Sequence, residues 1–324
     1  MTDRTIILSR RGFVTGCAAL AATPALAAPP VLRGAAATET ITGSAFATGW
    51  RVVLPSGPRP DLVAPIAALL AGIDAEMSPW RDDSAISSVN AMAPGVRGVS
   101  EEFAQVLAAA QALQVASGGT FDPRVGPAVA QWGFGPIHAA PGAGAFALEG
   151  GRLEKSGTAT LDLCGIAKGR ALDRVAGLLR AGGEGDFLIE IGGELMANGQ
   201  HPDSRPWRIG VEDPRPGVAG LERGIDLVDR AIATSGLKTQ SYMLNGQVYG
   251  HIIDPHDMRP VAAGPLASVS VMADSAMMAD GWATALMAAG PEDGPRLAET
   301  HRIDALFLYS EPNGLRAVTT GGMG

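Results

Sequence analysis

The chain has 324 residues, of which 46% are hydrophobic and 18% are charged, a composition that excludes a disordered chain and fits a globular protein with a sizeable core. Its formal net charge is −8, and an acidic surface argues against nucleic acid as a partner.

The N-terminus has the pattern of a twin-arginine export signal. Arg10 and Arg11 precede a mostly apolar stretch, and Ala-Leu-Ala at 25–27 offers a small-residue cleavage site. We therefore predict a signal peptide over residues 1–27, a periplasmic mature protein, and a linker over residues 28–40 that is rich in alanine and proline.

The predicted mature chain has one cysteine, because Cys17 lies within the signal and only Cys164 follows it. An intramolecular disulfide is therefore excluded. After the signal, no apolar run reaches the roughly 20 residues that a membrane-spanning helix needs. We do not expect the mature chain itself to be transmembrane.

Residues 41–324 are predicted to form one domain in which strands and helices are mixed but do not alternate regularly. This order favours an α+β fold over a doubly wound sheet. Proline, glycine and alanine over 141–151 indicate a loop. By hydrophobic periodicity, strands are expected at 41–54, 161–163, 187–196, 207–211, 248–253, 266–272 and 306–309, and helices at 62–77, 101–115, 166–181 and 275–289.

Residues 161–169 place a turn of small residues before a predicted helix. A helix N-terminus presents unpaired N–H groups and a partial positive charge, which favour a phosphate. Lys168 lies in the first turn, where a cation is poorly placed for the helix dipole, so that a bound anion would explain it better. The alternative is an ordinary surface lysine, and the spacing is not that of a Walker loop.

Asp280 and Thr284 are four residues apart on a predicted helix, which puts both side chains on one face. A carboxylate and a hydroxyl suit a hard cation such as Mg²⁺. Taken alone, the pair is more typical of a solvated aspartate and a threonine that bonds back to its own helix.

His251 lies in a predicted strand just before an Asp-Pro turn. Histidine is the side chain best suited to proton transfer near neutral pH, although an isolated strand histidine is more often only hydrogen-bonded. Two loops are candidates for ligand contact, one with Trp80 on a polar turn and one with glycines beside residues 120–122. Either loop can equally be a simple connection.

Seven elements in order resemble the ApbE family of flavin transferases, and together they span most of the chain from about residue 41. Leu161–Gly169 is similar to the family's Asp-Leu-x-Gly-Ile-Ala-Lys-Gly, and His251–Pro255 to its His-Ile-Ile-Asp-Pro. Ser275–Leu286 is similar to Ser-Ala-Met-x-Ala-Asp-x-x-Ala-Thr-Ala-Leu. The other four are Met77–Asn90, Gly119–Pro136, Glu190–Glu194 and Thr234–Gly236.

The resemblance implies a mixed α/β, two-lobed, T-fold-like architecture with a flavin cleft between the lobes, and transfer of FMN from FAD to a threonine or serine of an acceptor protein with release of AMP. It implies Mg²⁺ held by Asp280, Thr284 and the backbone oxygen of Gly165, and His251 as the base. The other implied contacts with FAD are Phe46, Trp80, Thr120, Phe121, Asp122, Asp162, Lys168, His251 and Ile252.

One departure from the family pattern concerns the flavin contact. Where the family has Met-Gly-Thr, this chain has Phe46-Ala47-Thr48. Phe46 keeps an apolar surface for the isoalloxazine ring, but Ala47 adds a Cβ where glycine would allow closer approach. A different flavin affinity or pose is expected.

Three alternatives stay open at this point. The same site with water as acceptor would hydrolyse FAD to FMN and AMP, and a non-catalytic maturation factor would bind flavin without turnover. The third alternative is that the chain itself is the flavinylated carrier. Its stretch most like the acceptor motif, roughly Asp-x-x-[Ser/Thr]-Gly-Ala-[Ser/Thr], is a poor match, because Leu153 stands where the motif has aspartate. By resemblance to exported members, including those of nitrous-oxide respiration, the acceptor would be a membrane-bound respiratory flavoprotein.

Overall fold

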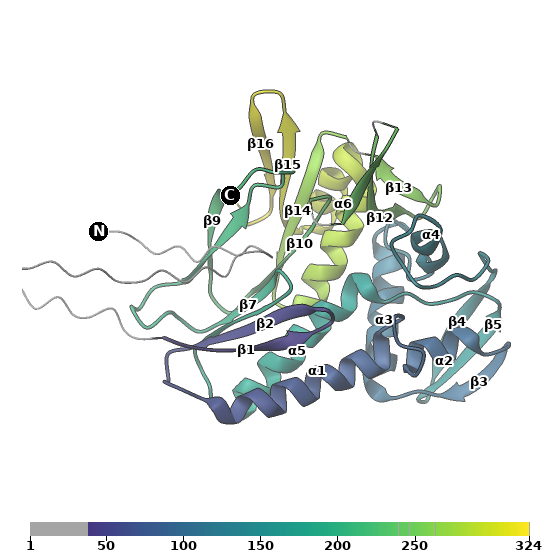
Figure 1. The fold of residues 1–324 in the computed structure, drawn as a ribbon, viewed down its shortest axis with the longest axis horizontal. Helices are drawn as coiled ribbons and strands as arrows, with labels where there is room; N and C mark the ends of the chain where they lie inside the picture. Colours follow the sequence, from purple (N-terminus) through teal and green to yellow (C-terminus); the bar gives the residue numbers. More distant parts are fainter. Residues whose placement is uncertain (1–37, 239, 246, 263, 324) are drawn as a thin grey trace, which may run out of the picture.

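A computed structural model describes residues 38–238, 240–245, 247–262 and 264–323. The predicted signal peptide and nearly all of the predicted linker lie outside the described residues. Within them, helices and strands are mixed without regular alternation, which confirms the α+β prediction (Figure 1). Strand β1 begins at Glu39, two residues before the predicted start of the first strand at residue 41.

An eight-stranded antiparallel sheet forms the centre of the molecule (Figure 1). Its strand β2 is buried on both faces: Trp50 and Leu54 join one hydrophobic core, and Val53 joins a second. This division follows because successive side chains of a strand point to opposite faces of the sheet. In spatial order the strands are β1 (Glu39–Ala45), β2 (Thr48–Leu54), β6 (Phe187–Ile191), β7 (Glu194–Asn198), β10 (Ala231–Gly236), β14 (Leu266–Ala273), β15 (Asp304–Glu311) and β16 (Gly314–Thr320).

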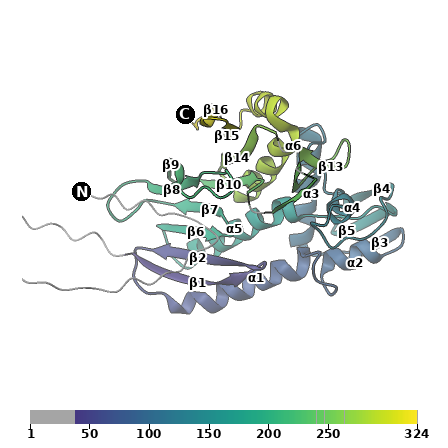
Figure 2. The ribbon, with the colours of Figure 1, turned by 45° about the horizontal axis from the view of Figure 1, so that its top comes forward.

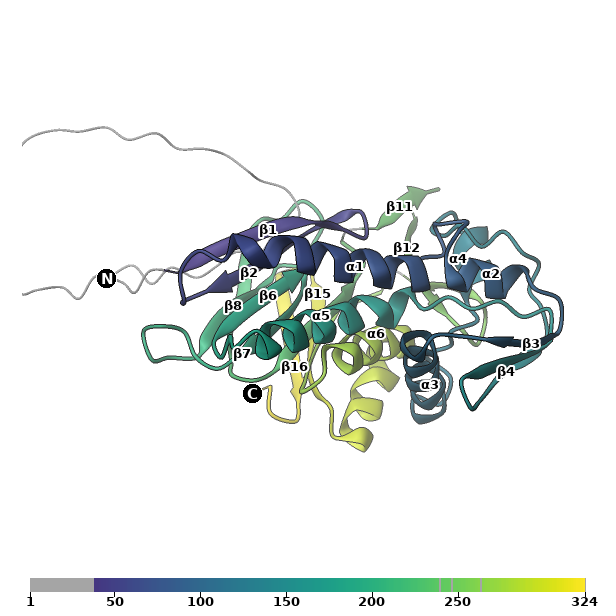
Figure 3. The same cartoon turned by 90° about the horizontal axis from the view of Figure 1, so that it is seen from below.

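Three long helices cover one face of this sheet: α1 (Val63–Met77), α5 (Cys164–Ala181) and α6 (Ala276–His301) (Figures 2 and 3). The other face packs against a hairpin of β8 (Trp207–Glu212) and β9 (Leu221–Leu227), whose apolar residues belong to the second core. Helices α5 and α6 are closely packed at Gly169. No side chain would fit there, since an added Cβ would lie 2.1 Å from the carbonyl oxygen of Ala276.

Smaller elements extend the fold beyond the main sheet (Figure 1). One three-stranded sheet has the order β3-β5-β4 and a second has the order β11-β12-β13, in which β12 contacts α4 and α6. These elements are η1 (Pro60–Leu62), α2 (Ala85–Ala91), α3 (Glu101–Ala116), α4 (Gly126–Gln131), β3 (Gly95–Gly98), β4 (Gly144–Glu149), β5 (Arg152–Gly157), β11 (Ser241–Leu244), β12 (Gln247–Asp254) and β13 (Arg259–Ala262).

Two predictions of local structure were wrong in the first half of the chain. The expected loop at 141–151 contains β4, which pairs with β5. The expected strand at 161–163 is an irregular segment, because the side chain of Asn90 replaces a partner strand there. Its Nδ2 donates to the oxygen of Leu161 at 2.8 Å, and the nitrogen of Leu161 donates to its Oδ1 at 2.7 Å.

Two further differences lie near the C-terminus. Helix α6 was expected to end at Ala289 but continues to His301, with a kink at Gly290, whose φ is +82°. Glycine tolerates this left-handed conformation, so the chain can resume a helical path after the kink. The strand expected to be the last, β15, is followed by β16.

The N-terminus of α6 is fixed by α5. Ser275 is the N-cap, and its Oγ also donates to Oδ2 of Asp173 at 2.7 Å. The nitrogens of Ala276 and Met277 donate to the same carboxylate at 2.7 and 3.0 Å. An anion at this end complements the helix dipole, so Asp173 sets the position of α6 relative to α5.

The β1–β2 turn is strained at the position where the sequence departs from the family pattern. Phe46 and Ala47 have φ values of +51° and +56°. A left-handed conformation costs a residue with a Cβ roughly 1–2 kcal/mol, and glycine avoids this cost. Phe46 is half-buried and packs against the main core.

We expect Ala47→Gly to raise the free energy of unfolding by about 1 kcal/mol, because glycine relieves this strain. Urea denaturation of the two proteins measures the difference. As a control, Ala68→Gly at an exposed position inside α1 should lower the free energy of unfolding by about 1 kcal/mol. A loss of stability in Ala47→Gly would contradict the strain argument.

Candidate active site

The side chains with the most unusual electrostatics meet where α5 and α6 cross. Asp280 on α6 is 5% exposed, and its Oδ2 accepts a hydrogen bond from the nitrogen of Gly169 at 2.9 Å. Lys168 on α5 forms an ion pair with Glu194 at the start of β7. One ammonium group therefore faces two buried carboxyl groups within a small volume.

Burial raises the pKa of Asp280 to about 7, because desolvation disfavours its charged form. The Lys168 ammonium lowers this pKa and the Glu194 carboxylate raises it, so the three groups are electrostatically coupled. Oε2 of Glu194 is buried without a hydrogen-bond partner among the described residues. A buried orphan acceptor is costly, and a cationic or donor ligand would offset that cost.

Gly165 and Thr284 lie side by side one turn away. Oγ1 of Thr284 is 3.4 Å from the carbonyl oxygen of Gly165 and 3.4 Å from Oγ of Ser235 on β10. A Cβ on Gly165 would lie 3.2 Å from Thr284 and 3.3 Å from the ring of Phe121, so glycine allows this close approach. Thr284 and the Gly165 oxygen, two of the three metal ligands that the resemblance implies, therefore lie in contact, and the third, Asp280, is four residues before Thr284 on α6.

These donors fit Mg²⁺. The described residues contain no cluster of three His, Cys, Asp or Glu side chains with metal-site geometry. Mg²⁺ does not need such a cluster, since it commonly uses one or two carboxylates and completes its shell with water and substrate phosphates. A cation beside Asp280 would also favour the ionised form of a carboxyl group that burial otherwise keeps protonated.

Asp162 stands at the N-terminus of α5, where its Oδ1 accepts from the nitrogen of Cys164 at 2.9 Å. Its own nitrogen donates to the oxygen of Pro123 at 2.7 Å, which ties this turn to the glycine-rich loop. Asp162 and Lys168 therefore lie on the same N-terminal turns of α5 as Gly165. This arrangement keeps the predicted nucleotide contacts beside the predicted metal ligands.

His251 lies on β12 and is held by the segment before β11. Its nitrogen donates to the oxygen of Gln240 at 3.2 Å, and its Nδ1 is 3.3 Å from the same oxygen. An Nδ1–H that donates to this carbonyl makes Nε2 the proton-accepting nitrogen of the ring. The ring of Phe134 meets His251 edge to face, with 6.3 Å between centroids.

The remaining predicted flavin contacts differ in exposure. Trp80 is exposed just after α1, whereas Phe121 and Ile252 are buried in the main core. Thr120 bonds back to Ser117, and Asp122 forms an ion pair with Arg124. Trp80 is therefore accessible from outside, whereas Phe121 and Ile252 belong to the hydrophobic core.

The sequence reasoning gave no role to Glu194 or Ser235. Both lie in quoted family-like elements, Glu190–Glu194 and Thr234–Gly236, so the motifs contained the signal. Only the fold shows the pairing of Glu194 with Lys168 and the contact of Ser235 with Thr284. These contacts join residues 26 and 49 positions apart, which no local pattern reveals.

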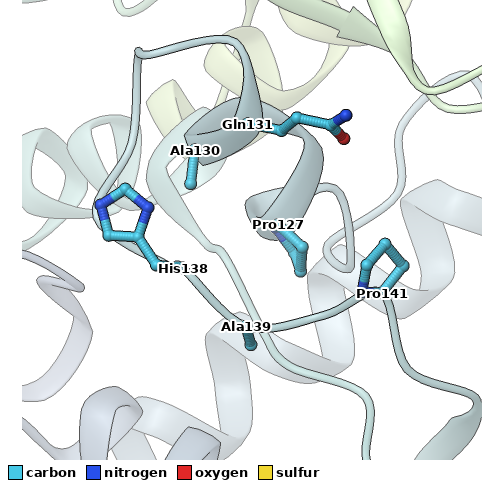
Figure 4. Close-up of a pocket in the computed structure, with 6 residues that line it drawn as sticks. All are labelled: Pro127, Ala130, Gln131, His138, Ala139 and Pro141. Atoms are coloured by element: carbon cyan, nitrogen blue, oxygen red, sulfur yellow. The ribbon is translucent and has the colours of Figure 1, made fainter.

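A pocket of about 350 Å³ lies between α4 and the segment before β4 (Figure 4). Its polar lining consists of one imidazole and one amide, and no predicted site residue belongs to it. We therefore place the chemistry at the α5–α6 crossing instead. The pocket is lined by Pro127, Ala130, Gln131, His138, Ala139 and Pro141.

Comparison with known proteins identifies the family. The ApbE family matches residues 46–307. A Vibrio cholerae FAD:protein FMN transferase is 35% identical over 78% of this chain and 80% of its own length. The apo flavinyl transferase ApbE of Pseudomonas stutzeri superposes with a TM-score of 0.78 at 32% identity, covering 88% of this chain and 95% of that one.

A flavin transferase ApbE from Vibrio cholerae, solved as a histidine-to-glycine mutant, also gives a TM-score of 0.78, at 31% identity over 89% of this chain and 99% of that one. The fold and the match over most of the chain define this protein as a flavin-transferase-like α+β protein. The chain belongs to the ApbE family.

Proposed function

We propose that this chain is an FAD:protein FMN transferase, which moves FMN from FAD to a threonine or serine hydroxyl of an acceptor protein. The observation that carries the proposal is the site at the α5–α6 crossing, where Lys168, Asp280 and Thr284 meet in a member of the ApbE family. Curated relatives with this activity match most of the chain.

The proposed reaction is a phosphoryl transfer from FAD to the acceptor hydroxyl. The acceptor hydroxyl gives its proton to Nε2 of His251, and its oxygen forms a bond to the phosphorus attached to riboflavin. The bond between that phosphorus and the oxygen of AMP breaks, and AMP leaves. Catalysis of this kind depends on positioning and charge neutralisation.

Each residue of the proposed site has a role in this reaction. Lys168 neutralises charge on the pyrophosphate, and Trp80 offers a face to the flavin. Asp280, Thr284 and the Gly165 oxygen would hold Mg²⁺, which typically contributes several kcal/mol of charge stabilisation. General-base help from His251 typically gives about 10²–10⁴-fold.

We also propose a place of action, from the N-terminal sequence, and a class of acceptor, from the resemblance to exported members of the family. The arginine pair and the residues after it support export to the periplasm in the folded state, and a membrane-bound respiratory flavoprotein would meet the enzyme there. No helix in the described part of the chain is long and apolar enough to cross a membrane.

The test measures AMP release and FMN attachment with and without an acceptor protein. The purified protein is incubated with FAD and Mg²⁺, with and without a reporter protein that carries a tail with the motif Asp-x-x-[Ser/Thr]-Gly-Ala-[Ser/Thr]. We expect AMP release that depends on the reporter, and one FMN adduct on the tail by mass spectrometry. AMP release without the reporter would indicate FAD hydrolysis, and flavin binding without AMP would indicate a maturation factor.

A further inference from the structure

Strand β11 has the features of an unprotected edge. Its four residues are all exposed, with Tyr242, Met243 and Leu244 at 37%, 72% and 52%. In the β11-β12-β13 sheet it has one neighbour, and Figure 3 shows it projecting at the outside of the molecule. Exposed edge strands are usually guarded by charge, proline or a bulge. Ser241–Leu244 contains no charged residue and no proline.

The register shows which backbone groups this edge offers. Tyr242 pairs with Tyr249 and Met243 with Val248, and just before β11 the nitrogen of His251 donates to the oxygen of Gln240. Hydrogen-bonded and non-hydrogen-bonded pairs alternate along such a hairpin, so that Tyr242 is in a hydrogen-bonded pair and Met243 is not. The backbone N–H and C=O of Met243 therefore point outward, toward any strand added at this edge.

Aromatic stacking joins this edge to the rest of the fold. The ring of Tyr242 stacks on Tyr249 at 5.7 Å and on Phe134 at 5.2 Å, and Tyr249 stacks on Trp132 at 5.3 Å. Trp132 also donates a hydrogen bond to the oxygen of Met258. A pre-organised surface loses little conformational entropy when it binds.

The edge is continuous with the proposed base. Gln240, which immediately precedes β11, contacts His251 through its carbonyl oxygen. A strand added outside β11 would lie two strand spacings, roughly 10 Å, from β12, which carries His251. The chain that follows such a strand would then have to turn past Gln240 to bring its hydroxyl to His251.

We propose that β11 is the docking edge for the acceptor protein, an extended segment of which adds as a strand and delivers its hydroxyl to His251. This inference rests on the proposed transferase activity, which requires a polypeptide to enter at His251. Strand addition suits this partner because backbone hydrogen bonds supply affinity with little dependence on sequence. The apolar side chains of β11 cover the flanking residues of the acceptor segment.

Met243→Lys tests the docking edge by adding a charged side chain, which disfavours pairing with another strand. We expect the KM for the tailed reporter protein to rise about tenfold or more, while FAD affinity and the kcat at saturating reporter stay near wild type. Met243→Pro, which removes the outward N–H, should raise the KM in the same way. Hydrogen exchange at β11 should slow in wild type when the reporter is added.

Val115→Lys is the matched control, since Val115 is 82% exposed at the end of α3 and should leave every parameter unchanged. An unchanged KM in both Met243 variants overturns the docking proposal while transfer by wild type persists. If Met243→Lys instead dissociates a homodimer without raising the KM, the edge pairs two copies of this chain and the proposal is also wrong. Absence of transfer by wild type would reject the proposed function itself.

Discussion

Asp280→Asn is expected to lower FMN transfer by at least about 10³-fold, because it removes the only carboxylate among the proposed Mg²⁺ ligands. The same change should abolish the rise in melting temperature that Mg²⁺ produces in the wild-type protein. Calorimetry in EDTA and in Mg²⁺ measures the second effect independently of activity. Asp274→Asn, at an almost fully exposed carboxylate just before α6, is the matched control.

The raised pKa of Asp280 also predicts the direction in which stability changes with pH. The pKa of Asp280 is about 7 in the folded protein and near 3.9 in the unfolded chain, so the folded state binds more protons between these values. The contribution of Asp280 to stability is therefore favourable below about pH 4 and is lost as pH rises through 7. In EDTA, the wild type should lose more stability than Asp280→Asn between pH 5 and pH 8.

Two results would contradict the assignment of Asp280. Normal transfer by purified Asp280→Asn would remove it from the metal site. An unchanged Mg²⁺-dependent shift in melting temperature in the variant would show that the cation binds elsewhere.

His251→Ala is expected to lower the kcat for transfer by about 10²–10⁴-fold, because the acceptor hydroxyl loses its proton acceptor. FAD affinity should change little, since the remaining predicted contacts stay in place. In the wild type, the transfer rate should rise with pH as the imidazole loses its proton. This rise should be absent in His251→Ala. Single-turnover assays with the tailed reporter separate this effect from FAD binding.

His256→Ala is the control for His251→Ala, because His256 is an exposed histidine on the same β-hairpin, bonded to Asp254. We expect it to transfer FMN at the wild-type rate. If His251→Ala keeps both the wild-type rate and the wild-type pH profile, another group accepts the proton. Equal losses in both variants would indicate a structural effect of the hairpin.

Much of the fold could be predicted because local chemistry decides it. Hydrophobic periodicity predicted the strands at 207–211 and 266–272, which the structure has at Trp207–Glu212 and Leu266–Ala273. Prediction failed at 161–163, where the partner of the backbone is the side chain of Asn90, 71 residues away. A long-range side-chain partner leaves no periodic signal in the segment that it binds.

The sequence by itself determined the family-like elements, their order, and the residue types Lys168, Asp280 and Thr284 that suit a phosphate and a cation. Only the tertiary structure decided that Lys168 faces the fixed anion of Glu194 and that Asp280 is desolvated enough to hold its pKa near 7. The physical reason is that residue type and spacing are local properties of the chain. Burial and charge coupling depend instead on how closely α5 and α6 pack, which glycine at position 169 permits.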